Sequence, residues 1–232
     1  MNAIPALVLV HGAFHHPLGW KSVIDEFPRE LDIRTVALPS SGTRPEVLGD
    51  MYSDADAVRS TVEGIGGPVV VCAHSYGGIP VTEALAGVDN VRRLVYLCAF
   101  QLDVGESLLS ATGGTPPDWW QMHESDGYID ALRPEEIFYT DLDPSTAREA
   151  STQLSHQSLR SMTQALTRAA WHNIPSTYIV CERDAAIPVA AQLSMAHRAQ
   201  RVRRMDTAHS PLLSRPAELA ALLLAESTTV QA

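Results

Sequence analysis

Six short, largely apolar runs recur along the chain, and helix-like segments lie between most of them. The runs occupy residues 6–12, 33–39, 68–75, 91–100, 176–184 and 201–209. A strand that is apolar at every position, and not only at alternate ones, is typical of a parallel sheet covered by helices. The pattern therefore predicts an α/β fold with a mostly parallel six-stranded sheet and helices on both faces.

Three of the intervening segments favour helices, and one segment is too long to be a simple connection. The helical segments are 53–66, with Ser53 as the expected N-cap, 78–87, and 216–227, which begins with Pro216. Residues 101–174 separate the fourth and fifth strands and contain a helix-like stretch at 143–166. Insertions of this size usually cover a binding site. We expect one domain over residues 1–232, with a helical cap inserted after the fourth strand at about 101–174.

Three chemically useful residues end predicted strands. Ser75 ends the third run, Asp184 the fifth and His209 the sixth. Because the carboxyl ends of parallel strands share one edge of a sheet, these side chains should meet there. A serine becomes a nucleophile when a histidine takes its proton and a carboxylate orients that histidine. The sequence therefore predicts a catalytic triad with Ser75 as nucleophile, His209 as base and Asp184 as acid.

The stretch "VCAHSYGG" around Ser75 is typical of a tight strand-to-helix turn that presents a nucleophile. Such a turn needs small residues on both sides of the serine. Gly77 meets this need after Ser75, and Ala73 stands where glycine is usual before it. One extra methyl group is a tolerable departure, so we retain Ser75 as the nucleophile.

Two backbone N–H groups are expected to bind the oxyanion of the reaction. One belongs to Tyr76, directly after Ser75 at a helix start, and the other to Ala13, in the loop after the first strand. Asp103, near the end of the fourth strand, is an alternative to Asp184 as the acid. The position of Asp184 after the next strand favours it, but the sequence leaves Asp103 open.

The charge of the chain disfavours two classes of partner, and its histidines, N-terminal segment and cysteines narrow the expected chemistry further. The 232 residues carry a formal net charge of -10, which disfavours nucleic acid and anionic membranes. His15 and His16 have no further ligands at metal-binding spacing, so neither a metal nor a cofactor is expected. No basic signal region precedes the first apolar run, and we expect a cytoplasmic protein. The cysteines favour neither a disulfide framework nor a zinc site; they are Cys72, Cys98 and Cys181.

Several motifs together carry a family resemblance: "LVLVHGAFHHPLGW", "VALPSSGT", "VVVCAHSYGG", "LVYLCAF", "STYIVCERDAAIP" and "DTAHSPLLSRPAELAALL". The chain resembles the plant methylesterase and hydroxynitrile-lyase branch of the α/β-hydrolases, with its bacterial esterase relatives, over most of its length except the cap. The resemblance implies an α/β-hydrolase fold. It also implies Ala13 as an oxyanion donor, His15 at the pocket wall, and Asp184 and His209 as catalytic residues.

Two positions separate esterases from lyases within this resemblance. Hydroxynitrile lyases of the branch carry threonine at the position of Gly12 and lysine at the position of Ser210, next to the catalytic histidine. The lysine charge stabilises the leaving cyanide. Its replacement by serine implies that this chain is not a lyase.

The expected substrate is a small apolar or aromatic carboxylic ester, and no other partner is required, although a homodimer is compatible with the sequence. Aromatic and sulfur-containing side chains in the insertion suggest an apolar pocket, or else they only attach the cap to the body. A thioester, a lactone or a C–C bond remains an alternative target, as does ligand binding with a slow or vestigial triad. The expected pocket residues are Gly12, Phe14, His15, Trp119, Trp120, Phe138 and Met162.

Overall fold

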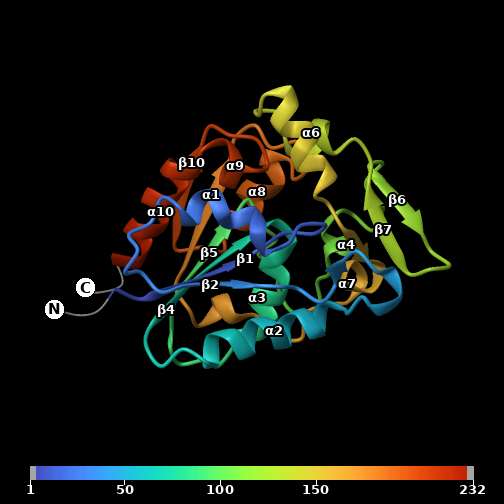
Figure 1. Cartoon of the computed structure of the whole chain (residues 1–232). Helices are drawn as coiled ribbons and strands as arrows, with labels where there is room; N and C mark the ends of the chain where they lie inside the picture. The colour runs from blue at the N-terminus through green and yellow to red at the C-terminus, as the bar shows by residue number, and fades with distance from the viewer. Residues whose placement is uncertain (1–3, 229–232) are drawn as a thin grey trace.

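The computed structural model of the protein describes residues 4–228, and a six-stranded sheet forms its centre (Figure 1). The strand order is β10-β9-β5-β4-β1-β2, and all neighbouring strands pair in parallel. Each strand falls within one of the apolar runs, so the predicted sheet is confirmed. The strands are β1 (Ala6–Val10), β2 (Ile33–Val36), β4 (Val69–His74), β5 (Val91–Leu97), β9 (Ser176–Cys181) and β10 (Arg201–Met205).

Alternate side chains of the central strands enter two separate cores, one on each face of the sheet. In β1, Val8 and Val10 pack into one core, while Leu7 and Leu9 pack into the other. The first core also receives α2 (Met51–Glu63), α3 (Gly78–Ala84) and α8 (Val189–Ala196). The second receives α1 (Lys21–Ile24), α9 (Pro211–Ser214) and α10 (Pro216–Thr228). Burial on both faces explains why β1 and most of β4 are apolar at consecutive positions.

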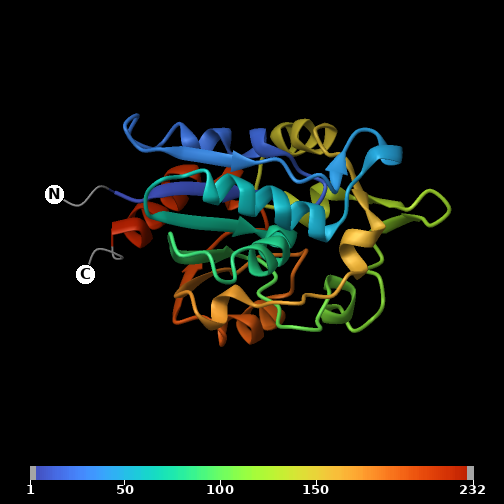
Figure 2. The ribbon, with the colours of Figure 1, turned by 90° about the horizontal axis from the view of Figure 1, so that it is seen from below.

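The insertion between β5 and β9 forms a cap beyond the carboxyl ends of the strands (Figure 1), and it is not purely helical as expected. Three of its strands join β3 (Ser41–Gly42) in a second, antiparallel sheet of order β3-β8-β7-β6. The β6–β7 hairpin projects away from the body (Figure 2). The cap elements are α4 (Leu108–Ala111), β6 (Trp120–His123), β7 (Tyr128–Ala131), α5 (Pro134–Phe138), α6 (Pro144–Thr152), β8 (His156–Ser158) and α7 (Leu159–Thr163).

Two helix predictions need correction. Helix α2 begins at Met51 with Asp50 as its N-cap, and Ser53 is instead the third helical residue, which returns a hydrogen bond in a capping box. The stretch 143–166 is divided into α6, β8 and α7, because residues 156–158 pair with β3 and β7 in the second sheet. Short single-turn helices complete the connections: η1 (Pro17–Trp20), η2 (Pro45–Val47), η3 (Ser75–Gly77) and η4 (Ala170–His172).

The described helices include none that is long and apolar enough to span a lipid bilayer. All three cysteines are buried and free.

Candidate active site

Ser75 lies in a strained turn that joins β4 to η3 and α3. Its φ angle is +53°, a left-handed conformation that is rare for residues other than glycine. The turn is packed so closely that a Cβ atom at Gly77 would lie 2.5 Å from the carbonyl oxygen of His11. In this turn the Ser75 side chain lines a cavity together with residues of the cap.

Ser75, His209 and Asp184 form a chain of hydrogen bonds. The Nε2 atom of His209 lies 2.9 Å from Ser75 Oγ, and its Nδ1 lies 2.7 Å from Asp184 Oδ2. Because a carboxylate only accepts, Nδ1 carries the proton and donates it to Asp184, which leaves Nε2 free to accept from the serine hydroxyl. An imidazole in this tautomer can take the serine proton during attack on a carbonyl carbon.

The carboxylate of Asp184 is itself fixed by its own strand-end loop. Its Oδ1 accepts from the N–H groups of Ala186 and Ile187 at 2.7 and 2.9 Å. Its Oδ2 accepts from the side chain of Gln192, on α8, at 3.0 Å. These donors hold the Asp184 carboxylate in one orientation. The position of the His209 ring therefore depends on the loop after β9 and on Gln192 of α8.

Asp103, the alternative acid, lies elsewhere. Its side chain is 38% exposed and its Oδ1 is 3.1 Å from Nε2 of His172. The structure therefore pairs His209 with Asp184 and pairs Asp103 with a different histidine.

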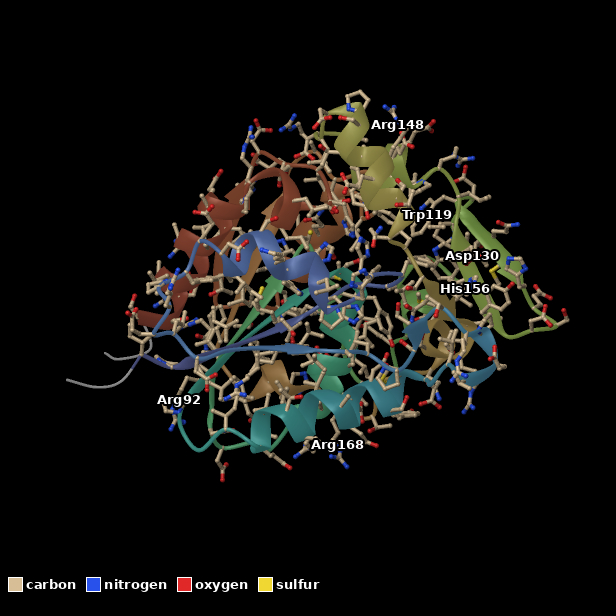
Figure 3. The ribbon with its side chains drawn as sticks, in the orientation of Figure 1. Arg92, Trp119, Asp130, Arg148, His156 and Arg168 are labelled. Atoms are coloured by element: carbon tan, nitrogen blue, oxygen red, sulfur yellow. The ribbon has the colours of Figure 1, made fainter. Side chains whose placement is uncertain are left out.

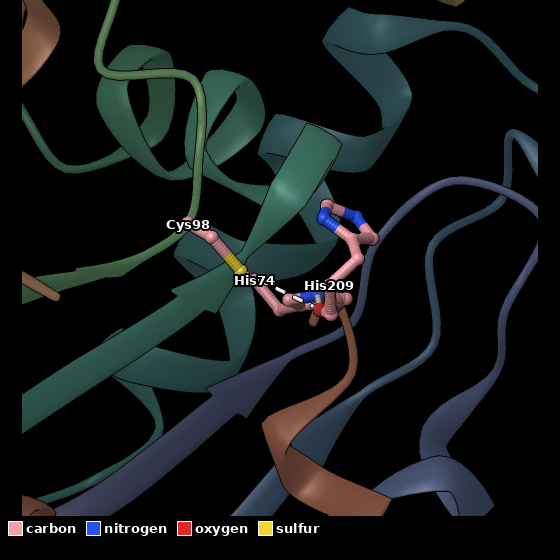
Figure 4. Close-up of side chains that lie close together, drawn as sticks. All are labelled: His74, Cys98 and His209. Atoms are coloured by element: carbon pink, nitrogen blue, oxygen red, sulfur yellow. Dashed lines mark hydrogen bonds between the residues drawn. The ribbon is translucent and has the colours of Figure 1, made fainter. Parts of the chain in front are cut away.

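The backbone of His209 is held by two further residues, His74 and Cys98 (Figure 4). The carbonyl oxygen of His209 accepts from Nε2–H of His74 at 2.8 Å and from the Cys98 thiol at 3.5 Å. Burial holds the pKa of His74 well below its usual value, so its ring is neutral and keeps the Nε2 proton for this bond. These three side chains also lie close enough for a metal site. However, both His209 nitrogens are engaged by Ser75 and Asp184, so protein hydrogen bonds account for the cluster.

Two backbone N–H groups next to Ser75 are available to a ligand. That of Tyr76 belongs to the first turn of η3, where no preceding helical carbonyl can accept it. That of Ala13 makes no hydrogen bond within residues 4–228. Both residues line the cavity that Ser75 faces. The arrangement matches what an oxyanion hole requires, namely two fixed donors beside a nucleophile.

Two histidines support the loop that carries Ala13. His15 donates from Nδ1 to the Ala13 carbonyl at 2.7 Å and accepts from the Tyr139 hydroxyl at Nε2 at 2.9 Å. His11 accepts the N–H of Leu38 at its Nε2. Burial lowers the pKa of His15 to about 3 and that of His11 to about 4, so both rings are neutral and act as fixed hydrogen-bonding groups.

The cavity above Ser75 is small and apolar. The space in it that the centres of water molecules can occupy is about 40 Å³, which is room for about three water molecules. Six residues expected from the sequence line it: Phe14, His15, Trp119, Trp120, Phe138 and Met162. Sequence reasoning missed Phe100, Leu108, Thr112, Pro117, Ala186 and Ile187. The position of Ala186 and Ile187 just after Asp184 was a usable signal, whereas nothing in the sequence distinguished Leu108 or Thr112.

Gly12 differs from its expected place because it is not among the residues that line the cavity. It lies against Ser75, and a Cβ atom on Gly12 would be 2.8 Å from Ser75 Cβ and 3.1 Å from Nδ1 of His74. Gly12 therefore lets the two loops approach each other closely, and it makes no surface for a substrate.

Comparison with known proteins agrees with this geometry. The profile described as "Alpha/beta hydrolase family" matches residues 7–222. The chain belongs to the alpha/beta hydrolase family. The alpha/beta hydrolase nvfD of Aspergillus novofumigatus is 32% identical over 231 residues, covering 91% of this chain and 92% of that protein. The probable hydrolase R7 of a Phoma species is 34% identical over 232 residues, covering 93% and 95% of the two chains.

Solved structures of alpha/beta hydrolases share the fold at low identity. A pyrethroid hydrolase from Sphingobium faniae superposes with a TM-score of 0.81 at 19% identity, covering 97% of this chain and 98% of that one. Polyneuridine aldehyde esterase gives 0.80 at 19%, covering 97% and 100%. The methylesterase protein MES16 from Arabidopsis gives 0.78 at 21%, covering 97% and 100%. The resemblance to the methylesterase branch of this superfamily is thus confirmed for the fold.

Proposed function

We propose that this alpha/beta hydrolase cleaves a small apolar or aromatic carboxylic ester through an acyl-enzyme. The observation that carries the proposal is the hydrogen-bonded chain Ser75–His209–Asp184, which ends beside two free backbone N–H groups in an apolar cavity. Esterases and a pyrethroid hydrolase are among the proteins that share its fold, which supports the same reaction class.

In the proposed reaction, Ser75 Oγ attacks the ester carbonyl carbon while Nε2 of His209 takes the hydroxyl proton. The carbonyl oxygen becomes an oxyanion and accepts hydrogen bonds from the N–H groups of Ala13 and Tyr76. Collapse of the intermediate breaks the bond to the alcohol oxygen, which leaves with the proton held by His209. Water then attacks the acyl carbon and gives a proton to His209. As the bond from the acyl carbon to Ser75 Oγ breaks, His209 returns that proton to Ser75, and the acid is released.

The cavity walls support the proposed substrate class. Phe14, Trp119 and Phe138 are in mutual ring contact with centroids 5.4 to 6.2 Å apart. Ligand sites of this kind select apolar groups, because a charged group would lose its hydration without gaining a partner. The small free volume fits a short acyl chain or a single ring better than a long fatty acyl chain.

A fluorophosphonate probe tests the nucleophile directly. The wild-type protein should be labelled at Ser75 within minutes, and Ser75→Ala should not be labelled, because the probe reacts only with an activated serine. An unlabelled wild-type protein would contradict the hydrolase proposal and favour a ligand-binding protein with a vestigial triad.

A substrate panel separates the remaining alternatives. Short-chain p-nitrophenyl esters should be hydrolysed faster than matched thioesters and lactones, and C–C bond substrates should not react. Faster turnover of thioesters or lactones would keep the triad mechanism but replace the proposed ester with one of those substrates.

A further inference from the structure

A buried carboxylate on α2 lies close to the active site but outside the triad. Asp54 is fully buried and accepts three hydrogen bonds, from the Ser40 N–H at 2.8 Å, from the Ser40 hydroxyl, and from the Tyr76 phenol at 2.6 Å. All three donors are neutral. A buried carboxylate costs free energy unless its oxygens are satisfied, so these bonds fix the positions of Ser40 and Tyr76.

The Ser40 hydroxyl extends this network into the cap. Since Ser40 Oγ donates to Asp54, it can only accept from Nε2 of Gln157, which lies 2.7 Å away on β8. The second proton of that amide goes to Ser161 Oγ at 2.8 Å, which itself donates to the Ser158 carbonyl. Both amide protons are therefore assigned, and the side-chain oxygen of Gln157 must face the remaining donor.

That remaining donor belongs to the loop that forms one half of the expected oxyanion hole. Gln157 Oε1 accepts the N–H of Phe14 at 3.1 Å, and the Phe14 carbonyl accepts the N–H of Ser155 at 2.7 Å. Phe14 has a φ angle of +66°, which is unfavourable for a bulky residue unless its surroundings hold it there. The cap segment around β8 thus hydrogen-bonds to both the N–H and the carbonyl of Phe14, the residue that follows Ala13.

We propose that Asp54 and Gln157 are positioning residues that hold the two oxyanion donors, Ala13 and Tyr76, at a fixed separation. The donors come from different loops, and this network connects them: Tyr76 binds Asp54 directly, while the Ala13–Phe14 segment reaches Asp54 through Gln157 and Ser40. The cap strand β8 is then part of the catalytic machinery and not only a lid. This inference rests on the proposed hydrolase function.

Gln157→Leu tests the cap side of the network. The variant keeps the size of the side chain but loses the bond to Phe14, so Ala13 can shift away from the oxyanion. We expect the kcat for p-nitrophenyl acetate and the fluorophosphonate labelling rate to fall about 10- to 100-fold, somewhat less than the loss of a whole donor. The KM should change less than about 3-fold, because Trp119, Phe138 and Met162 still line the cavity.

Tyr76→Phe tests the body side, and it also covers the case in which Gln157→Leu does not fold. It removes only the hydroxyl group that donates to Asp54 and keeps the ring and the backbone N–H, so we expect a smaller loss of kcat, about 5- to 10-fold. The matched control is Thr82→Val, which removes another buried hydroxyl. That hydroxyl donates to the Gly78 carbonyl at 2.7 Å and accepts from the Tyr96 hydroxyl at 2.8 Å, and it makes no bond to Asp54, Ser40 or Gln157. The control variant should behave as the wild-type protein in both assays.

The affinity for phenylboronic acid gives a readout that simple loss of stability would not change. Its tetrahedral serine adduct places a negative oxygen at the two donors, so its inhibition constant should rise in Gln157→Leu in parallel with the loss of kcat. Variants that label and turn over as fast as Thr82→Val, or that change KM alone, would overturn the inference while leaving the hydrolase proposal intact. A wild-type protein that the probe does not label would overturn both.

Discussion

At the scale of single residues, the two candidate aspartates differ in which histidine they bind. Asp184 is 8% exposed and binds the His209 ring, whereas Asp103 is partly exposed and binds His172. The enclosed carboxylate is the one that can stabilise a positive imidazolium, because water screens the other.

Asp184→Asn should lower kcat for a p-nitrophenyl ester by about 10²-fold or more. The asparagine amide would present an N–H where the aspartate accepts one, so the tautomer of His209 that accepts the serine proton would lose its support. The measurement is steady-state kinetics on protein whose folding is confirmed by circular dichroism.

Asp103→Asn is the matched control, since it makes the same chemical change at the exposed pair. It should keep kcat within about 2-fold, as exposed ion pairs contribute little. If Asp103→Asn proves the more damaging of the two, the assignment of the acid is wrong.

At the scale of elements, the turn between β4 and α3 depends on the close approach of two loops. Gly77→Ala should lower the free energy of unfolding by about 1 to 3 kcal/mol and slow fluorophosphonate labelling, because the new methyl group meets the rigid backbone carbonyl of His11. Urea unfolding measures the first effect, and the labelling rate measures the second.

Gly66→Ala, at the other end of β4, is the control for this prediction. Its Cβ atom would have no neighbour within 4 Å, so we expect a change of about 0.5 kcal/mol or less. If Gly77→Ala changes the free energy of unfolding and the labelling rate as little as Gly66→Ala does, the turn tolerates a side chain and Ser75 is not held by close packing.

The sequence predicts these elements unevenly, for physical reasons. The central strands are visible because burial on both faces demands a continuous apolar run, as in "VVVCAH". The edge strands β2 and β10 are half-exposed and carry arginines, so they are recognised mainly by their place in the strand-helix alternation. The cap strands "WQMH", "YIDA" and "HQS" are short and half-polar, and their pairing with distant segments leaves no local pattern.

Some residues of the candidate site can likewise be predicted from the sequence, and others cannot. Ser75, Asp184 and His209 are predictable because parallel strands bring their ends to one edge. Gln157 is not, because an amide that bonds across the fold resembles any surface glutamine in the sequence. Gly12 was misplaced for a related reason: a glycine that permits close packing and one that opens a pocket look the same along the chain.

At the scale of the whole molecule, buried ionisable groups determine how stability depends on pH. The folded protein keeps His11, His15 and His74 neutral, with each pKa lowered by burial. In the unfolded chain they bind protons near pH 6.5, so their contribution to stability is present above that pH and is lost as the pH falls. Asp54 acts in the opposite sense, because burial raises its pKa to about 6 and the folded state then holds a proton that the unfolded state releases.

These shifts predict the number of protons taken up on unfolding. At pH 5 the three histidines should bind about three protons on unfolding and Asp54 should release about one, a net uptake of about two. The free energy of unfolding should therefore fall by about 2 to 3 kcal/mol for each pH unit near pH 5, and it should become nearly independent of pH above about 7.5. Urea unfolding at pH values from 5 to 8 measures this slope. Asp54→Asn should steepen it to about three protons at pH 5, whereas a wild-type slope near zero would mean that the folded protein admits protons to these histidines.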